Sequence, residues 1–201
     1  MANLELEQAL WQQGFQNIAG VDEAGRGPLA GPVIAAAVIF PKDCMIDGVN
    51  DSKQLSAKQR DLLFDRIHAQ ALAVGVGRVD HTEIDRINIL QATMLAMKYA
   101  LEQLPAPPDY VLVDGNYFTH KGYQFKTIVE GDAKSFTIAA ASIIAKVTRD
   151  RLMMKLDARY PEYGFAKHKG YGTQQHLDAL KQYGLCEIHR RTFTRKFLNE
   201  P

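Results

Sequence analysis

The sequence predicts an α/β fold in which helices flank a mixed central β-sheet. Apolar runs of strand length are too numerous for a helical bundle. Helical patterns intervene between several of these runs, which is typical of a sheet that contains parallel pairs. Hydrophobic residues make up 46% of the 201-residue chain and charged residues 23%, so the chain can form a packed core.

The amino-terminal half contains three runs of strand length, at residues 18–22, 33–40 and 72–79. A glycine-rich stretch separates the first run from the second, and prolines bracket the second. An irregular segment follows, at residues 42–53. Ser56 and Gln59 then form a capping-box pattern, which predicts a helix that continues to about Ala71.

The second half alternates helices and strands before it ends in helices. A helix is expected at residues 88–104, closed by a proline-rich stop, with short strands at 110–113 and 124–129. A long helix is expected from about 135 to 160, followed by a helix at about 173–183 and a basic tail. We predict a single domain, 1–201, with a catalytic core at about 15–160 and a helical, basic carboxyl-terminal extension at about 161–201.

Composition excludes some classes of protein. No window approaches the roughly 18 uninterrupted apolar residues that a membrane span requires. The amino-terminal residues are acidic and lack a basic region, so no signal peptide is expected. The two cysteines, Cys44 and Cys186, form neither a metal-binding spacing nor a disulfide framework, which favours a reducing cytoplasm. No oligomerisation pattern is evident, so a monomer is the default expectation.

Charge is distributed unevenly along the chain. The formal net charge is only +1. Residues 1–144 nevertheless hold 12 basic and 17 acidic residues, whereas residues 145–201 hold 12 basic and 6 acidic. This asymmetry is consistent with a basic nucleic-acid-binding face beside an acidic site, and equally with an ordinary solvated helical surface.

Acidic residues follow the ends of several expected strands. Asp22 and Glu23 close the first strand, Asp114 closes the strand at 110–113, and Asp132 precedes the long helix. Functional groups of open α/β sheets gather at the carboxyl ends of strands. Carboxylates brought together there repel one another unless cations lie between them. Mg²⁺ and Mn²⁺ prefer such oxygen ligands, and two ions about 4 Å apart can promote hydrolysis of a phosphodiester.

Each carboxylate also has a structural interpretation. Asp132 could cap the long helix, and Asp114, which precedes a glycine, could be a turn residue. The charges of Asp22 and Glu23 need a partner after an apolar strand, and Arg26 could supply it.

The glycine-rich segment at residues 25–31 superficially matches a phosphate-binding loop. Such a loop opens into a helix, but the residues after Pro32 are typical of a strand. The glycines could instead bring backbone groups close to a ribose 2′-hydroxyl, the group that distinguishes RNA from DNA. A tight hairpin without a ligand is the alternative.

Taken together, several motifs closely resemble bacterial ribonuclease HII, a type 2 ribonuclease H. The similarity runs from about Ile18 to Arg191. The motifs, in order along the chain, are Val-Asp22-Glu23-Ala-Gly25-Arg26-Gly27-Pro, Asp51-Ser52-Lys53, Asp114-Gly-Asn, Gly131-Asp132-Ala-Lys, the helical segment from Ala140 to Asp150, and His168-Lys-Gly-Tyr171-Gly.

The resemblance implies an RNase H-like fold with a helical carboxyl-terminal extension. It implies hydrolysis of the RNA strand of RNA–DNA hybrids and incision at ribonucleotides embedded in duplex DNA, leaving 3′-hydroxyl and 5′-phosphate ends. A role in ribonucleotide excision during DNA repair and replication follows from this activity. The cofactor would be Mn²⁺ or Mg²⁺, and a replication-associated protein is an expected candidate partner of the basic tail.

The resemblance also implies a role for each matched residue. Asp22, Glu23, Asp114 and Asp132 would be the metal-binding and catalytic carboxylates. The substrate contacts would be the 2′-hydroxyl-sensing loop, the aromatic residue that packs on the sugar, and two phosphate or backbone contacts: Gly25, Arg26, Gly27, Tyr171, Lys53 and Ser142.

The remaining polar residues are expected to be less central. Asp150 competes for the role of fourth carboxylate, although a structural ion pair is the favoured interpretation. We expect His168, His176 and His189 to contact phosphate or to lie on the surface, because imidazole is not a preferred Mg²⁺ ligand. The basic residues Arg190, Arg191, Arg195 and Lys196 are expected on a nucleic-acid face or in a solvated tail.

Two other functions compete with the hybrid-specific nuclease. A structure-selective DNA nuclease or resolvase of RNase H-like fold would share the acidic cluster but would not sense a 2′-hydroxyl. A non-catalytic nucleic-acid-binding module would explain the basic carboxyl-terminal half but not the carboxylates at the strand ends.

Overall fold

The computed structural model describes residues 2–198 and contains a five-stranded sheet in the order β3-β2-β1-β4-β5. β2 is antiparallel to both β1 and β3, whereas β4 is parallel to both of its neighbours, β1 and β5. The expected mixed sheet is therefore confirmed. The strands are β1 (Ile18–Ala24), β2 (Val33–Ile39), β3 (Ala73–Val79), β4 (Tyr110–Asp114) and β5 (Gln124–Ile128).

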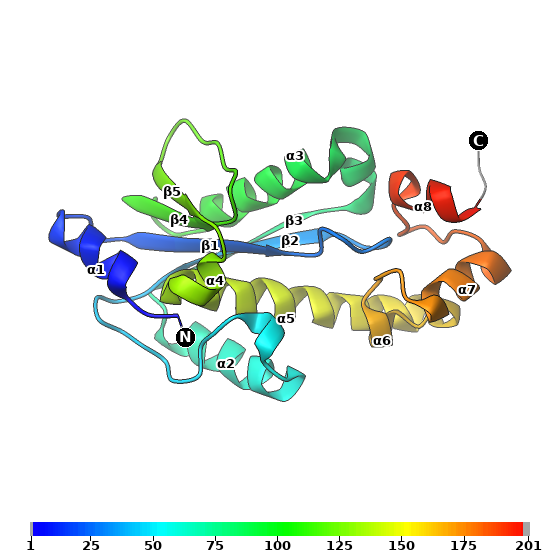
Figure 1. Cartoon of the computed structure of the whole chain (residues 1–201), viewed down its shortest axis with the longest axis horizontal. Helices are drawn as coiled ribbons and strands as arrows, with labels where there is room; N and C mark the ends of the chain where they lie inside the picture. The colour runs from blue at the N-terminus through cyan, green and yellow to red at the C-terminus, as the bar shows by residue number, and fades with distance from the viewer. Residues whose placement is uncertain (1, 199–201) are drawn as a thin grey trace.

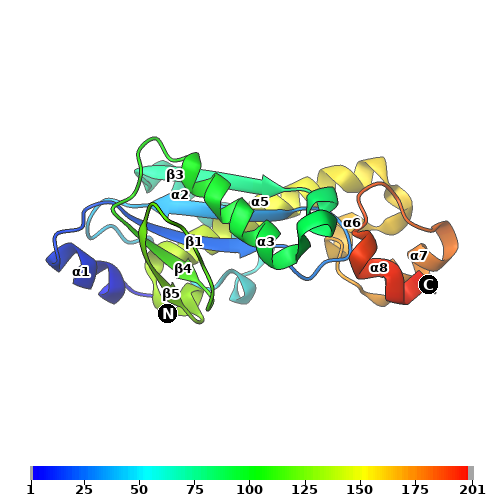
Figure 2. The ribbon, with the colours of Figure 1, turned by 90° about the horizontal axis from the view of Figure 1, so that it is seen from above.

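Helices cover both faces of this sheet and extend beyond one end of it (Figures 1 and 2). The α-helices are α1 (Glu5–Gln12), α2 (Ala57–Gln70), α3 (His81–Glu102), α4 (Gly131–Lys134), α5 (Phe136–Arg159), α6 (Phe165–His168), α7 (Gln174–Tyr183) and α8 (Arg191–Leu198). None of the helices among the described residues is both long enough and apolar enough to span a membrane.

Strand β2 is apolar throughout because both of its faces are buried. Alternate residues face opposite ways. Ile34, Ala36 and Val38 therefore pack on the α5 side, whereas Ala35 and Ala37 pack on the α3 side. The alanines that interrupt the β-branched run leave room for helices on both faces.

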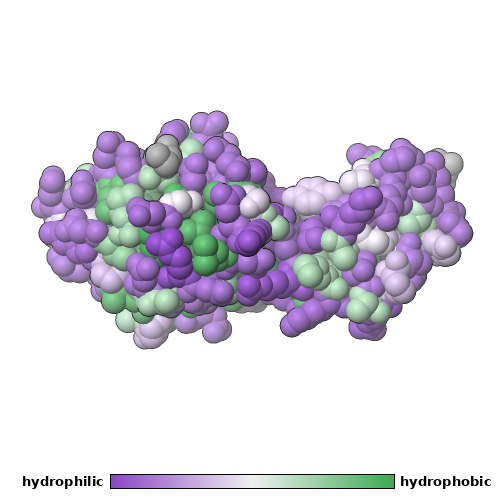
Figure 3. All heavy atoms as spheres, turned by 90° about the horizontal axis from the view of Figure 1, so that it is seen from below, coloured by the Kyte–Doolittle hydropathy of each residue, from purple (hydrophilic) through white to green (hydrophobic). Residues whose placement is uncertain are grey.

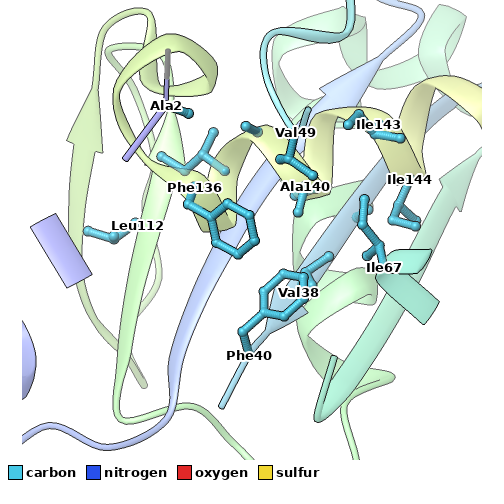
Figure 4. Packing of buried hydrophobic residues seen from close by; sticks show 14 of the residues in the cluster. Ala2, Val38, Phe40, Val49, Ile67, Leu112, Phe136, Ala140, Ile143 and Ile144 are labelled. Atoms are coloured by element: carbon cyan, nitrogen blue, oxygen red, sulfur yellow. The ribbon is translucent and has the colours of Figure 1, made fainter. Parts of the chain in front are cut away.

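Helix α5 packs closely against β1 and β2 on one face of the sheet. A Cβ atom at Gly20 in β1 would lie 2.2 Å from the backbone carbon of Thr137, so this approach requires glycine. Figure 4 shows Phe136 and Ala140 of α5 facing Val38 and Phe40, with Ile67 of α2 beside Ile144. The alanine-rich first half of α5 thus permits the close helix–sheet contact that its composition predicts.

Helix α3 covers the other face and is longer than expected. It begins at His81, not at residue 88, but Asn88 has a left-handed backbone (φ 67°) that kinks it. The Asn88 side chain accepts hydrogen bonds from the amides of Leu90 and Gln91, as a helix-capping residue does. The sequence signal at Asn88 therefore marked a real break, and the preceding helical segment was missed.

The amino-terminal helix α1 was not predicted. Its Glu7 is fully buried and accepts hydrogen bonds from the hydroxyls of Ser135 and Thr137 and from the amide of Thr137. Glu7 thus attaches α1 to the beginning of α5.

The carboxyl-terminal helices form a smaller lobe with its own apolar cluster. This cluster includes Phe165, Leu180 and Ile188, together with Met153 of α5 and Leu29 from the loop after β1. The space-filling view shows the smaller lobe joined to the main body by a narrower region, with a mainly hydrophilic surface on this face (Figure 3). Helix α5 and the loop after β1 therefore contribute to both lobes.

Candidate active site

Two carboxylates meet at the carboxyl ends of the adjacent parallel strands β1 and β4. Val21 pairs with Val113, so the next residues, Asp22 and Asp114, lie side by side at the edge of the sheet. The Oδ1 atom of Asp114 accepts a 2.7 Å hydrogen bond from the amide of Gly131, at the start of α4. Parallel pairing therefore produces the convergence that the sequence suggested.

Glu23 is the second acidic residue at the end of β1. Its Oε1 lies 3.2 Å from Nη1 of Arg26, which confirms Arg26 as a charge partner of Glu23. The amide of Glu23 donates a 2.6 Å hydrogen bond to Oδ1 of Asp22.

Asp132 is buried in α4, and its Oδ2 lies 3.2 Å from the Nζ of Lys53. The alternative that Asp132 caps the long helix is wrong, because the Ser135 side chain accepts the capping hydrogen bond from the amide of Ile138. Asp132 is therefore free of a capping role.

Burial and neighbouring carboxylates raise the pKa values of Asp22, Glu23 and Asp132. Burial raises the pKa of Asp22 well above its ordinary value, and the charges of Glu23 and Asp114 raise it further. Burial likewise raises the pKa of Glu23, although Arg26 opposes this shift. The pKa of Asp132 is raised by burial and by Asp114, against the lowering effect of Lys53. The cationic side chains of Arg26 and Lys53 thus do not fully offset the effect of burial and repulsion on these pKa values.

A cavity of about 210 Å³ opens beside these carboxylates. It is lined by most of the residues that the sequence singled out: Asp22, Glu23, Gly25, Arg26, Gly27, Lys53, Asp114, Ser142 and Tyr171. Asp132 does not line the cavity itself and is connected to it through Lys53.

Three polar residues that line this cavity received no site role from the sequence: Ser52, Lys146 and Arg149. The Ser52 hydroxyl lies 2.8 Å from that of Ser142, which joins the short 3₁₀ helix Ser52–Gln54 to α5. Lys146 and Arg149 follow Ser142 at helical spacing, so a search along that face of α5 would have found them.

Asp150 forms a structural ion pair, as favoured from the sequence. Its Oδ1 lies 2.7 Å from the Nζ of Lys146, one turn earlier in α5. The partner is thus Lys146 and not the flanking arginines.

The glycine-rich loop leads directly into β2 and not into a helix, which agrees with the argument against a phosphate-binding loop. Gly25 has a left-handed backbone (φ 101°), and a Cβ atom there would lie 2.1 Å from Nε of Arg149. Gly27 lies beside the ring of Tyr171, because its Cβ position is 3.6 Å from Cε1 of that ring. The loop and the aromatic residue therefore form one wall of the cavity.

Arg190 does not lie on the surface, so its assignment to a nucleic-acid face or a solvated tail was wrong. Its guanidinium is fully buried and donates to the carbonyl oxygens of Gly25, Arg26 and Gly31, at 2.6, 2.8 and 2.9 Å. A partly buried amphipathic helix, α8, follows it, and Arg191 at its start is exposed.

The expected surface or phosphate-contact positions of the three histidines were also wrong. His168, His176 and His189 are buried together in the carboxyl-terminal lobe. Nδ1 of His176 lies 2.9 Å from the carbonyl oxygen of Tyr171, and Nε2 of His176 lies 3.0 Å from Nε2 of His189. Since that carbonyl can only accept, Nδ1 of neutral His176 carries the proton and its Nε2 accepts from His189.

Acidic side chains gather at the carboxyl ends of adjacent parallel strands, and cationic side chains flank them at a cavity. This is the arrangement of a nuclease with an RNase H-like sheet. The family model described as Ribonuclease HII matches residues 19–196. The chain therefore belongs to the ribonuclease HII family. It is an endonuclease that cleaves the RNA of RNA–DNA hybrids and at ribonucleotides embedded in DNA.

Curated relatives support this assignment over nearly the whole chain. Ribonuclease HII of Acetivibrio thermocellus is 55% identical over 192 residues, covering 96% of this chain and 75% of that protein. Ribonuclease HII of Geobacter metallireducens is 57% identical over 194 residues, covering 93% and 91%.

A solved structure of similar fold, ribonuclease H2 from Pyrococcus horikoshii, superposes with a TM-score of 0.74 at 33% identity. This match covers 91% of this chain and 97% of that one. The RNase HII in a PCNA complex from Archaeoglobus fulgidus superposes with a TM-score of 0.71 at 25% identity, covering 87% and 93%.

Proposed function

We propose that Asp22, Glu23, Asp114 and Asp132 hold the divalent cations with which this ribonuclease cleaves its substrate. The convergence of Asp22 and Asp114 at adjacent parallel strand ends carries this proposal, together with burial and the charges of Glu23 and Asp114, which raise the pKa of Asp22. Bound cations relieve such repulsion, and a carboxylate site without them keeps a destabilising charge.

The donor set fits Mg²⁺ or Mn²⁺, because all four residues offer carboxylate oxygens. Within residues 2–198, no three His, Cys, Asp or Glu side chains already converge on one metal position. The carboxylates are engaged instead with Arg26, Lys53 and backbone amides. A bound metal cation would compete with these donors for the carboxylate oxygens.

The bound metal would supply charge neutralisation and an activated water for in-line attack on the phosphodiester, leaving 3′-hydroxyl and 5′-phosphate ends. Lys53 offers a cation to substrate phosphate, since its side chain is 78% exposed. Ser142 is buried, and its hydroxyl lies 2.8 Å from that of Ser52 at the cavity that Asp22 also lines, which supports a role for Ser142 in this site.

Selectivity for RNA would come from the loop of Gly25, Arg26 and Gly27, whose backbone lies at the cavity. Tyr171, which is 46% exposed beside Gly27, would pack on the sugar at the RNA-to-DNA junction. An apolar ring face suits a deoxyribose, and backbone amides suit a 2′-hydroxyl.

Cleavage-site mapping tests this proposal. A DNA duplex with one ribonucleotide, and the same duplex without it, are incubated with the enzyme in Mg²⁺, in Mn²⁺ and in chelator. We expect a single cut at the ribonucleotide, only with metal. Equal cutting of both duplexes would favour a resolvase, and cutting in chelator would refute the metal mechanism.

The identity of the ion and the protein partners stay predictions. A solved structure of Bst-RNase HIII is a complex with Mn²⁺, but that chain is 19% identical and supports the fold alone. The Archaeoglobus fulgidus structure is a complex with PCNA, so we propose a replication clamp as a candidate partner of the exposed basic residues Arg191, Arg195 and Lys196. Cytoplasmic location and a monomeric state likewise stay predictions.

A further inference from the structure

Two buried arginines hold the loop between β1 and β2, and carboxylates do not pair with either of them among the described residues. Arg149 is 1% exposed and donates to the carbonyl oxygens of Pro32, Ala30 and Lys169, at 3.0, 3.2 and 3.0 Å. Arg190, described above, binds three further carbonyls of the same loop. Burying a guanidinium is costly unless its donors are satisfied, and here backbone carbonyls satisfy them.

The hydrogen bonds of Arg190 fix the direction of two backbone amides. A trans peptide is planar and its C=O and N–H point in opposite directions; the described residues contain no cis peptide. Because the carbonyls of Gly25 and Arg26 point at Arg190, the amides of Arg26 and Gly27 point away from it. Within residues 2–198, neither amide donates a hydrogen bond to another protein group.

We propose that Arg190 is a positioning residue for ribose recognition: it holds the amides of Arg26 and Gly27 ready to donate to the 2′-hydroxyl. The loop that carries these amides lines the cavity beside the carboxylates. Arg149 holds the other end of the loop and, through the carbonyl of Lys169, the turn that carries Tyr171. The inference rests on the proposed role of this loop and assigns to the carboxyl-terminal lobe a part in selectivity.

The geometry requires a guanidinium at residue 190. Nε, Nη1 and Nη2 each donate to a different carbonyl, and these directions are fixed by the planar group. A lysine keeps the charge but directs its donors from one point and cannot reproduce three diverging hydrogen bonds. The Arg190→Lys substitution therefore separates positioning from charge.

The test measures binding in an Asp22→Asn background, in Mg²⁺, so that substrate is not consumed. Dissociation constants are compared for a DNA duplex with one ribonucleotide and for the same all-DNA duplex. We expect Arg190→Lys to reduce the preference for the ribonucleotide about tenfold, the effect of losing well-placed hydrogen bonds, while all-DNA binding changes less than about twofold. Arg159→Lys is the matched control, because Arg159 is exposed and pairs with Glu187 in the same lobe; it should leave the preference unchanged.

An unchanged preference in folded Arg190→Lys would overturn the inference. If the Asp22→Asn protein itself shows no preference, the ribose-sensing role of the loop fails, and cleavage by that protein would instead refute the catalytic proposal. Should Arg190→Lys not fold, nitrogen NMR of the Arg190 Nε group in the Asp22→Asn protein replaces it. Its resonance should shift with the ribonucleotide duplex and not with the all-DNA duplex, whereas equal responses would contradict the proposal.

Discussion

Two neighbouring regions of the protein differ in how their buried charges are compensated. The acidic edge of the sheet contains Asp22, Glu23 and Asp114, and the arginine-rich junction with the carboxyl-terminal lobe contains Arg149 and Arg190. At the acidic edge, burial and then the neighbouring like charges raise the pKa of Asp22, and cationic side chains compensate these effects only in part. At the junction, Arg149 and Arg190 are equally buried, but carbonyl oxygens accept hydrogen bonds from both guanidinium groups. Burial alone therefore does not identify a functional site, whereas several buried like charges with incomplete compensation support the candidate metal site.

This comparison predicts opposite responses to substitution. Neutralising a carboxylate at the acidic edge should abolish activity and relieve electrostatic repulsion. Removing an arginine at the junction should instead destabilise the fold.

The largest effect is expected for Asp22→Asn. Loss of a metal-holding carboxylate should lower kcat/KM at least about a thousandfold. The same change removes a buried, repelled charge, so the metal-free protein should melt at a higher temperature. Cleavage assays and calorimetry without metal check both signs.

Asp61→Asn is the matched control for this substitution. Asp61 is exposed and pairs with Arg151 on the surface, so activity and melting should stay close to the unaltered protein. A fall in the melting temperature of metal-free Asp22→Asn would contradict this prediction, because it would show that the charged carboxylate stabilises the folded protein.

The next effect is a loss of stability in Arg149→Met. Three carbonyls would lose their donor in a buried position, which should lower the free energy of unfolding by about 3 kcal/mol. Urea titration measures this loss. The exposed Arg159→Met should change the same quantity by less than about 0.5 kcal/mol, and equal losses would contradict the contrast between the two regions.

The buried histidines predict a pH dependence of stability. Burial, together with the nearby His176, lowers the pKa of His189 to about 4, from an ordinary value of 6.5. Between these values the unfolded chain binds a proton that the folded protein does not, so stability falls as pH falls through this window. The contribution approaches about 1.4 kcal/mol per pH unit.

Urea titrations across this pH window test the linkage. His189→Gln should make the fall in stability shallower, because one of the groups that gains a proton on unfolding is gone. A slope identical to that of the unaltered protein would show that His189 does not contribute.

The smallest effect is expected for Lys53→Gln. The side chain is mostly exposed, so its pair with Asp132 contributes less than about 1 kcal/mol, and kcat/KM should fall about fivefold. Because Lys53 lowers the pKa of Asp132, its loss should also move the acid limb of the activity profile to higher pH. Lys58→Gln, on the exposed face of α2, is the control, and an unshifted acid limb in Lys53→Gln would argue against this electrostatic role.

Much of the fold followed from local patterns. The apolar runs at β1 to β5 and the Ser56–Gln59 capping box were sufficient to place the strands and α2, and the capping box is present as expected. Helix α1 was missed because its amphipathic pattern is short and depends on the distant contacts of Glu7 with Ser135 and Thr137. The first turns of α3 were missed because the Asn88 signal marks a kink inside the helix.

Local sequence patterns identify the residues that could carry the chemistry, because acidic residues that follow apolar strands can be recognised without a structure. The packing of distant segments makes Asp22 and Asp114 neighbours, since parallel pairing of β1 with β4 joins residues far apart in the chain. It alone also separated Arg190 from exposed Arg191. Charge and residue type are local properties, whereas burial and hydrogen-bond partners depend on how distant segments pack.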